Sequence, residues 1–256
     1  MKQWNQNEFG LRTLSSGQVV GAFPALERLS GIAHAVTTRS CGDFGPAHRG
    51  SDVAALGFIT ATLGVPDAAW AEHVHGTQVL VADHPGRAGA ADGIVTRRPG
   101  LAIMAFSADC TDILIADPAV RAVGAIHAGW KGAAGRGASS LVRAMAYHFG
   151  SRPADLVACV GPSIGPCCFG ANEEMIAEVR ANYAQDADEF LSPRRKHVAF
   201  DLWRANVLDL QSAGVPPDNI HVAGLCTYCR NDIFFSHQKE LQTGTFCSAI
   251  ALTEAD

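Results

Sequence analysis

A cysteine and a histidine flank two predicted strands, and thiol and imidazole groups can bind metals or catalyse reactions. Cys110 precedes the apolar run 112–116, and His127 follows the apolar run 122–126. A turn at Asp117-Pro118 joins the two runs, so we predict an antiparallel pair of buried strands. This pairing would bring Cys110 and His127 to the same end of a sheet.

His75 adds a second imidazole, because it lies in a turn before a strand predicted at 78–82. Two imidazoles and one thiolate suit a catalytic zinc site, in which three protein ligands leave a fourth position for water or substrate. The alternative is that Cys110 is a small buried residue and each histidine is a hydrogen-bonded core group. Spacing alone does not bring His75 to the other two. His73 would share a face with His75 in an extended segment and is a weaker candidate ligand.

The other cysteines give a weaker metal signal. The pair Cys226-x-x-Cys229 is half of a zinc site, and Cys159, Cys167 and Cys168 could complete a site of four thiolates. We favour plain buried thiols for this group. Adjacent residues in an extended segment point to opposite sides, so at most one of Cys167 and Cys168 is expected to face such a site.

Arg39, Lys131 and Arg136 are candidates for holding an anion. Lys131 precedes a predicted helix that runs to about Phe149, and free N–H groups at a helix N-terminus favour phosphate. The alternative for each cation is a solvated surface position. The loop GPSIGP after Val160 either presents backbone donors to a ligand or forms a rigid turn.

The elements that position these residues are strands and helices in a mixed order, without a repeat or linker, so we expect one α/β domain over residues 1–256. Strands are predicted at 32–39, 78–82, 100–106, 112–116, 122–126, 156–160 and 220–223, with an aromatic strand in the tail LCTYCRNDIFFSHQKE. Helices are predicted at 51–63, from the Gly-rich stretch after His127 to about 149, from a cap at Asn172 to 183, and at 201–212.

Composition excludes several classes of protein. The chain has 256 residues, a net charge of −5 and 48% hydrophobic residues, which is typical of a globular protein with a sizeable core. It has no basic block and no apolar run near the roughly 20 residues of a membrane span, so neither nucleic acid nor a membrane is an expected partner. The N-terminus lacks the apolar core of a signal peptide, which predicts a cytoplasmic location and thiols rather than disulfides. No protein partner is predicted.

The sequence resembles the YfiH family, also called the laccase-domain or polyphenol-oxidase-like family. The matching segments follow the family's order across nearly the whole chain, and HAGWKG and GPSIGP are the most specific. They are TTR at 37–39, VHGTQV at 74–79, ADC at 108–110, HAGWKG at 127–132, GPSIGPCC at 161–168, CTY at 226–228 and FFSH at 234–237. The resemblance implies a single layered α/β sandwich, with mixed sheets packed together and flanked by helices. It also implies metal ligands at His75, Cys110 and His127.

The same resemblance implies a zinc-dependent enzyme acting on purine nucleosides. Members are described as phosphorolysing adenosine, inosine, guanosine and methylthioadenosine, and as deaminating adenosine. A zinc ion with an open position lowers the pKa of bound water to about 7, which suits attack on C6 of adenine. For phosphorolysis, Arg39 or Lys131 would orient phosphate toward the ribose C1′, beside Cys110 and His127 in the catalytic group.

Other chemistries fit the same residues. Copper-dependent oxidation of polyphenols has been claimed for the family, and two histidines with one cysteine and a distant Met also describe a blue-copper site. A multicopper oxidase is disfavoured because the chain has ten histidines and one His-x-His pair, His73 and His75. Bacterial members have been linked to editing of cell-wall precursors. A metal-free hydrolase using Cys110 and His127 is the remaining alternative.

Three segments depart from the family pattern. The loop after Arg39 is shorter than usual, and Phe169-Gly170-Ala171 stands where members often have Tyr-Glu-Val. Gln238 and Thr245 replace cations in the tail. If those cations contact substrate, we expect shifted specificity or weakened activity.

Overall fold

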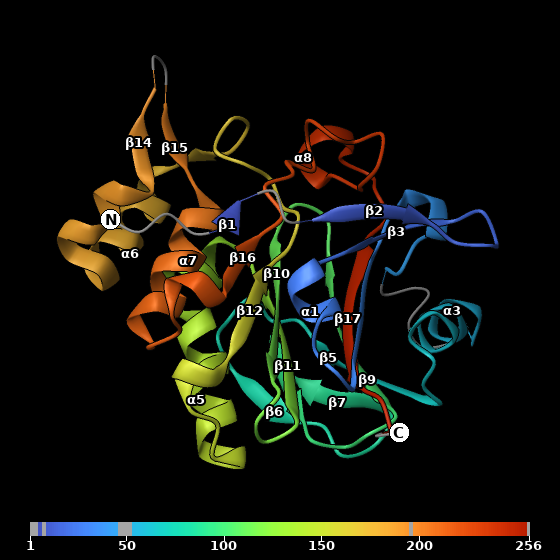
Figure 1. Cartoon of the computed structure of the whole chain (residues 1–256). Coiled ribbons are helices and arrows are strands. Elements are labelled where there is room, and N and C mark those ends of the chain that lie inside the picture. Colours follow the sequence, from blue (N-terminus) through green and yellow to red (C-terminus); the bar gives the residue numbers. More distant parts are fainter. Residues whose placement is uncertain (1–4, 7–8, 46–52, 195–196, 255–256) are drawn as a thin grey trace.

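Two mixed β-sheets packed face to face form the centre of the molecule (Figure 1). The computed structural model describes residues 5–6, 9–45, 53–194 and 197–254. In spatial order, the first seven-stranded sheet contains β1 (Asn5–Gln6), β16 (Ile220–Val222), β12 (Val157–Val160), β10 (Thr111–Asp117), β11 (Ala122–Ala128), β8 (Gly93–Thr96) and β6 (Val79–Val81). The second contains β2 (Gly10–Thr13), β3 (Val19–Ala22), β4 (Ile32–Thr37), β17 (Phe246–Leu252), β9 (Leu101–Ser107), β5 (Asp67–Glu72) and β7 (Gly86–Ala90).

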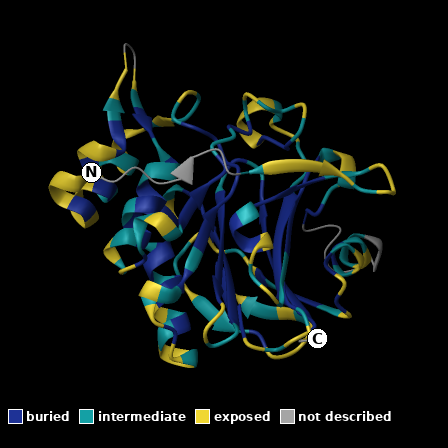
Figure 2. Ribbon diagram, viewed as in Figure 1, coloured by how far each residue is buried: buried dark blue, intermediate teal, exposed yellow. Residues whose placement is uncertain are grey.

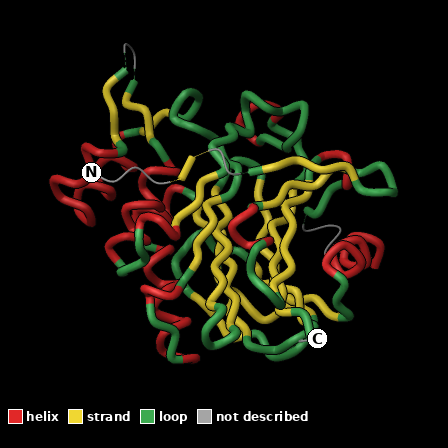
Figure 3. Tube along the Cα trace, viewed as in Figure 1, coloured by secondary structure: helices red, strands yellow, loops and turns green. Residues whose placement is uncertain are grey.

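Helices cover the outer faces of both sheets (Figure 3). The helices α5 (Gly137–Phe149) and α7 (Leu202–Ser212) pack on the first sheet, and α3 (Val53–Leu63) packs on the second. The other elements are α1 (Pro24–Glu27), α4 (Trp130–Ala134), α6 (Glu173–Tyr183), α8 (His237–Glu240), and a small sheet of β13 (Gly170–Ala171), β15 (Val198–Phe200) and β14 (Leu191–Pro193). The predicted sandwich of mixed sheets flanked by helices is therefore confirmed.

The central strands are apolar throughout because both of their faces are covered. All seven residues of β9, β10, β11 and β17 are buried, as the dark blue strands of Figure 2 show. Side chains alternate across a strand. In β10, Ile113 and Ile115 pack toward α5 and α7, whereas Leu114 and Ala116 pack between the two sheets. This double burial explains why the strands read as continuous apolar runs in the sequence.

Several predicted elements are confirmed, and the strand pair is the most important. The strands β10 and β11 are antiparallel, with Asp112 opposite His127. Asn172 caps α6 by accepting the N–H of Met175 at 2.8 Å, and Asp201 caps α7. The predicted helix start at residues 51–52 lies outside the described residues.

Other predictions were wrong in ways that have local causes. The helix expected up to Phe149 is two helices, α4 and α5, separated by Gly135 and by Arg136 with a φ of 63°. Lys131 therefore lies inside α4 rather than ahead of a helix. The aromatic tail segment forms turns, not a strand.

The strands that the sequence did not reveal are mainly poor in β-branched residues. The strands β5 (DAAWAE) and β7 (GRAGA) consist largely of alanine and glycine, which have low β-propensity. They are held by parallel pairing with β9 and with each other. Within the part of the chain that the structure describes, no helix is both long enough and apolar enough to cross a membrane.

His34 makes the fold sensitive to acid. His34 lies in β4, and its Nε2 atom accepts the N–H of Phe23 at 2.8 Å. Burial, and then the charge of Arg12, lowers the pKa of His34 from 6.5 to about 4. The unfolded chain therefore binds a proton at His34 below pH 6.5, where the folded chain does not. The stabilisation is complete above that pH and is lost as the pH falls toward 4.

We predict that His34→Gln, which keeps an acceptor for the N–H of Phe23, reduces this acid sensitivity. Between pH 7 and pH 4, the free energy of unfolding of the wild type should fall more than that of the variant, by up to about 3 kcal/mol. Urea unfolding of both proteins at the two pH values measures the difference. Parallel losses in the two proteins would contradict the assignment.

Candidate metal centre

Three of the side chains that the sequence singled out converge in the structure. The ligand atoms of His75, Cys110 and His127 all lie within 4.8 Å of one another. Cys110 immediately precedes β10 and His127 lies near the end of β11, so the pairing of these strands brings both to one end of the first sheet. The strand β8 pairs with β11 on one side and with β6 on the other, which brings the turn containing His75 to the same place.

A buried carboxylate fixes the turn that carries His75. Asp92 accepts the backbone N–H groups of Val74, His75 and Gly76 at 3.0, 2.8 and 2.6 Å. It is 1% exposed. His75 itself has a φ of 57°, a left-handed conformation that needs such support in a residue other than glycine. Sequence reasoning missed Asp92; the one signal available was an acidic residue within the otherwise small and apolar stretch AADGIVT.

A second buried carboxylate fixes the backbone beside Cys110. Asp109 has a φ of 95°, and its two carboxylate oxygens accept the hydroxyl of Thr227 at 2.6 Å and the N–H of Gln238 at 2.7 Å. Its carbonyl oxygen accepts the N–H of Ile164 at 2.8 Å. Two segments that resemble family motifs, and the residue that follows a third, are thus tied to the residue before Cys110.

A third buried carboxylate orients His127. The Nδ1 atom of His127 lies 3.3 Å from Asp112 and 3.2 Å from Ser107, and Ser107 donates to Asp112 at 2.8 Å. The Nε2 atom of His127 is buried and has no hydrogen-bond partner among the described residues. A histidine held by a carboxylate at one nitrogen and unpartnered at the other has the usual arrangement of a metal ligand. The donor set of two imidazoles and one thiolate fits zinc or copper.

The charges around the three ligands favour a cation. Burial alone would lower the pKa of His127, but the neighbouring Cys110 and the carboxylate of Asp112 raise it to about 10. Burial and the charge on His127 lower the pKa of His75. A metal ion that binds at His127 therefore competes with a proton there.

Gly129 leaves the space that the ligands need. A Cβ atom at this position would lie 2.8 Å from the sulfur of Cys110 and 3.7 Å from the ring of His75. The φ of Gly129 is −66°, which any residue adopts. Space, rather than backbone conformation, therefore requires glycine here.

Two hollows meet at Cys110. One, of about 200 Å³, has mainly apolar and aromatic walls formed by Ala108, Asp109, Cys110, Trp130, Ile164, Phe169, Met175, Leu202, His237 and Gln238. The other, of about 360 Å³, is lined by Val74, His75, Cys110, Trp130 and Lys131. Lys131 therefore shares an opening with two of the three ligands.

The other two cations predicted to hold an anion, Arg39 and Arg136, pair instead with side chains and main-chain carbonyls of the protein. Arg39 forms an ion pair with Glu240, donates to the carbonyl of Asn231 at 2.7 Å, and stacks 4.5 Å from the ring of Phe235. It thereby fastens α8 to the second sheet. Arg136 stacks 4.1 Å from the ring of Tyr183 and donates to the carbonyl of Asn182.

His73 lies beside the three ligands without joining them. Its ring stacks on that of His127, with centroids 4.4 Å apart. It also packs against Phe106 of β9. Its position is that of a neighbouring ring, because the group of converging ligand atoms contains His75, Cys110 and His127.

Comparison with known proteins gives a consistent picture. The sequence model of a family described as multi-copper polyphenol oxidoreductase laccase matches residues 53–253. The chain is 37% identical over 168 residues to human "Purine nucleoside phosphorylase LACC1", a match that covers 64% of this chain but 38% of the human protein. It is 30% identical to "Purine nucleoside phosphorylase YfiH" of Escherichia coli strain K12, over 98% of this chain and 97% of that protein. The crystal structure of Bacillus licheniformis YfiH, a hypothetical protein, superposes with a TM-score of 0.83 at 28% identity, covering 95% and 99% of the two chains.

We predict that Asp92→Asn weakens zinc binding at the three converging ligands by about 10–100-fold, because the amide cannot accept all three N–H groups that hold His75 in place. Competition with a fluorescent chelator measures the dissociation constant. Asp83→Asn, which changes an exposed carboxylate one strand away, is the control and should bind zinc as the wild type does. Equal affinities in all three proteins would show that Asp92 does not support the site.

Proposed function

We propose that this chain, which belongs to the family described as multi-copper polyphenol oxidoreductase laccase, is a zinc-dependent purine nucleoside phosphorylase that also deaminates adenosine. Its expected substrates are adenosine, inosine, guanosine and methylthioadenosine, with phosphate. The observation that carries the proposal is the convergence of His75, Cys110 and His127. Cys110 borders the hollow of about 200 Å³ with aromatic walls, and Lys131 lines the other hollow together with His75 and Cys110. The names of the human and Escherichia coli relatives support the same activity.

The three converging side chains would hold the ion. Asp112 and Ser107 keep the ring of His127 oriented, so that its Nε2 atom remains available. When bound, a zinc ion with one open position supplies an activated water and a positive charge. Cys110 is half-buried and borders both hollows, so a substrate in either one lies against this ligand.

The aromatic hollow suits the flat purine ring. Trp130, Phe169 and Met175 provide apolar surface against which a base can stack. The polar side chains of His237 and Gln238 lie in the same wall, where they can pair with ring atoms or ribose hydroxyls. Gln238 stands where relatives carry a cation, so we propose that specificity is shifted at this end of the hollow.

Lys131 is the better supported cation for phosphate. It borders the opening that also contains His75 and Cys110, so its ammonium group can orient phosphate toward a ribose held next to the ion. Arg39 already pairs with Glu240 and with main-chain carbonyls. A phosphate role for Arg39 stays a prediction, and it would require Glu240 to move.

A copper oxidase is the second candidate, and one observation favours it. Met175 lines the same hollow as Cys110, and a methionine near two histidines and a cysteine is the ligand pattern of blue-copper sites. A multicopper centre has less support. Among the described residues, the groups able to hold a metal are the three converging ligands and a cluster of four cysteines, with no second set of histidines.

We expect zinc-loaded protein to release hypoxanthine from inosine only when phosphate is present, and to form inosine from adenosine without phosphate. Cys110→Ala should lower kcat/KM for both reactions by more than about 100-fold, because a ligand is lost. Chromatography of the products measures each reaction. Turnover that survives both Cys110→Ala and a chelator would contradict the proposal. Zinc-bound protein that acts on neither nucleoside would favour a cell-wall precursor as substrate, and oxidation of phenols only after copper loading would favour the oxidase.

A second test separates the two cations. Lys131→Met should lower kcat/KM for phosphate by about 10–100-fold, the loss expected for one charge-assisted hydrogen bond, and should spare deamination. Lys131→Arg should restore part of the loss. Arg143→Ala, at an exposed position on α5, is the matched control and should change nothing. A loss in Arg39→Ala but not in Lys131→Met would move the phosphate to Arg39, and no loss in either would overturn this part of the proposal.

A further inference from the structure

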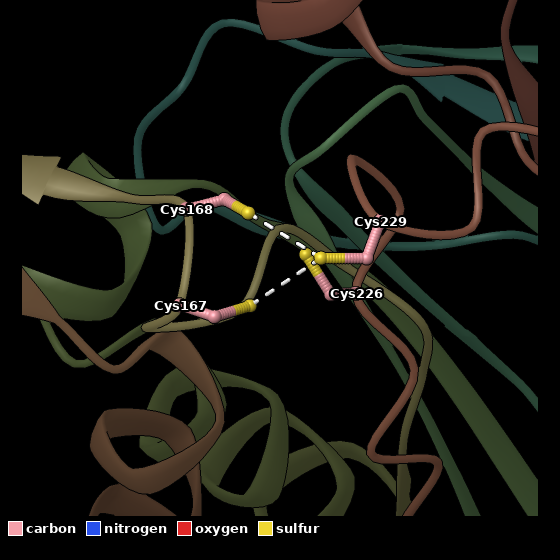
Figure 4. Close-up of side chains that lie close together, drawn as sticks. All are labelled: Cys167, Cys168, Cys226 and Cys229. Carbon is pink, nitrogen blue, oxygen red and sulfur yellow. Dashed lines mark hydrogen bonds between the residues drawn. The ribbon is translucent and has the colours of Figure 1, made fainter.

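Four thiols from two distant parts of the chain meet in one cluster (Figure 4). Cys167 and Cys168 follow the GPSIGP loop, and Cys226 and Cys229 form the CxxC pair. Their four sulfur atoms all lie within 4.8 Å of one another. The sulfur of Cys229 lies 3.7 Å from that of Cys167 and 3.4 Å from that of Cys168.

This arrangement differs from what the sequence predicted. Adjacent cysteines were expected to diverge, but the chain forms a tight turn here: the N–H groups of Cys168 and Phe169 both donate to the carbonyl of Gly165 at 3.0 Å. Both sulfur atoms therefore face Cys229. The interpretation as plain buried thiols was also wrong for Cys167 and Cys229, which are exposed.

We propose that these four cysteines form a second, structural metal site that binds one zinc ion as tetrathiolate. A Zn–S bond of about 2.3 Å places the sulfurs of a tetrahedral site about 3.8 Å apart, close to the separations seen here. Four protein ligands leave no open position, which is the pattern of structural rather than catalytic zinc. Cys159, buried in β12, is not part of the cluster.

The surroundings of Cys226 favour a thiolate. The N–H of Gly165 donates to the sulfur of Cys226 at 3.2 Å. Such N–H donors to sulfur orient a metal ligand and spread its negative charge.

A zinc ion explains the cluster better than disulfides do. A disulfide joins two sulfurs and gives no reason for two more to approach, whereas a tetrahedral ion requires all four. A divalent ion offsets the repulsion between thiolates and releases their protons as it binds.

The site would join the loop that lines the aromatic hollow with Ile164 and Phe169 to the loop that carries Cys226 and Cys229. Ser163 and Cys226 already form an isolated parallel bridge, and the N–H of Thr227 donates to the carbonyl of Ser163 at 3.1 Å. Phe169, next to Cys168, lines the hollow, and Thr227 bonds to Asp109 beside Cys110. The ion would therefore stabilise the position of Phe169 and of the loop that contacts Asp109, without contacting a substrate in the hollow.

Metal analysis tests the proposal independently of the activity. In the His75→Ala/Cys110→Ala protein, whose other site has lost two ligands, elemental analysis should still find one zinc per chain. Adding Cys167→Ser and Cys229→Ser should remove it, whereas adding Cys41→Ser, a half-buried cysteine outside the cluster, should not. No zinc in the His75→Ala/Cys110→Ala protein after supply of the ion would overturn the proposal.

Alkylation of the wild-type protein gives a readout that needs no variant. Cys167, Cys168, Cys226 and Cys229 should resist a thiol reagent until a chelator is added, as judged by peptide mass mapping. Replacement of zinc by cobalt should produce the intense visible bands of a tetrahedral tetrathiolate. Equal alkylation with and without chelator would overturn the proposal, and so would protection that a reductant alone removes, since that identifies a disulfide.

Discussion

Three buried carboxylates hold the candidate metal centre together, one for each of the converging side chains. Asp92 fixes the turn that carries His75, and Asp112 orients the ring of His127. Asp109, the third, anchors the backbone beside the cysteine ligand. A buried carboxylate is costly unless its oxygens are hydrogen-bonded, so each one strongly disfavours any movement of the groups that it binds. His75 and His127 are therefore held by their own hydrogen bonds to carboxylates, and Cys110 is held through the bonds of its neighbour Asp109.

The sequence predicted the ligands better than their supports, and the reason is physical. Strands covered on both faces leave a local trace, the unbroken apolar run, so the pairing that joins Cys110 to His127 could be predicted. The approach of His75 depends on the pairing of β8 with both β6 and β11, which leaves no local pattern. The hydrogen-bond partners of Asp92 and Asp109 also lie in other segments of the chain, so no local pattern predicts these contacts. A buried carboxylate and an exposed one look alike in a sequence.

The cysteine cluster shows the opposite error, in which a local rule was applied where it does not hold. Alternation of side chains is a property of extended chain. At Cys167 and Cys168 the chain turns, because proline at 166 and glycine at 165 favour a turn over a strand. Similarly, the break between α4 and α5 follows from a single left-handed residue, Arg136, which helical periodicity does not reveal.

The three converging ligands are buried to different extents. The affinity for an ion and the rate at which it exchanges therefore depend on different ligands. His127 lies in the sheet interior, Cys110 is half-buried and His75 is exposed. The sheet can release its ligand only by opening strands that are buried on both faces, among the slowest motions of a folded protein. Asp92 holds the backbone at His75, but the exposed imidazole can change rotamer on a much shorter timescale. We therefore expect the rate of ion exchange to depend on the His75 side chain and the binding equilibrium to depend on the buried ligands.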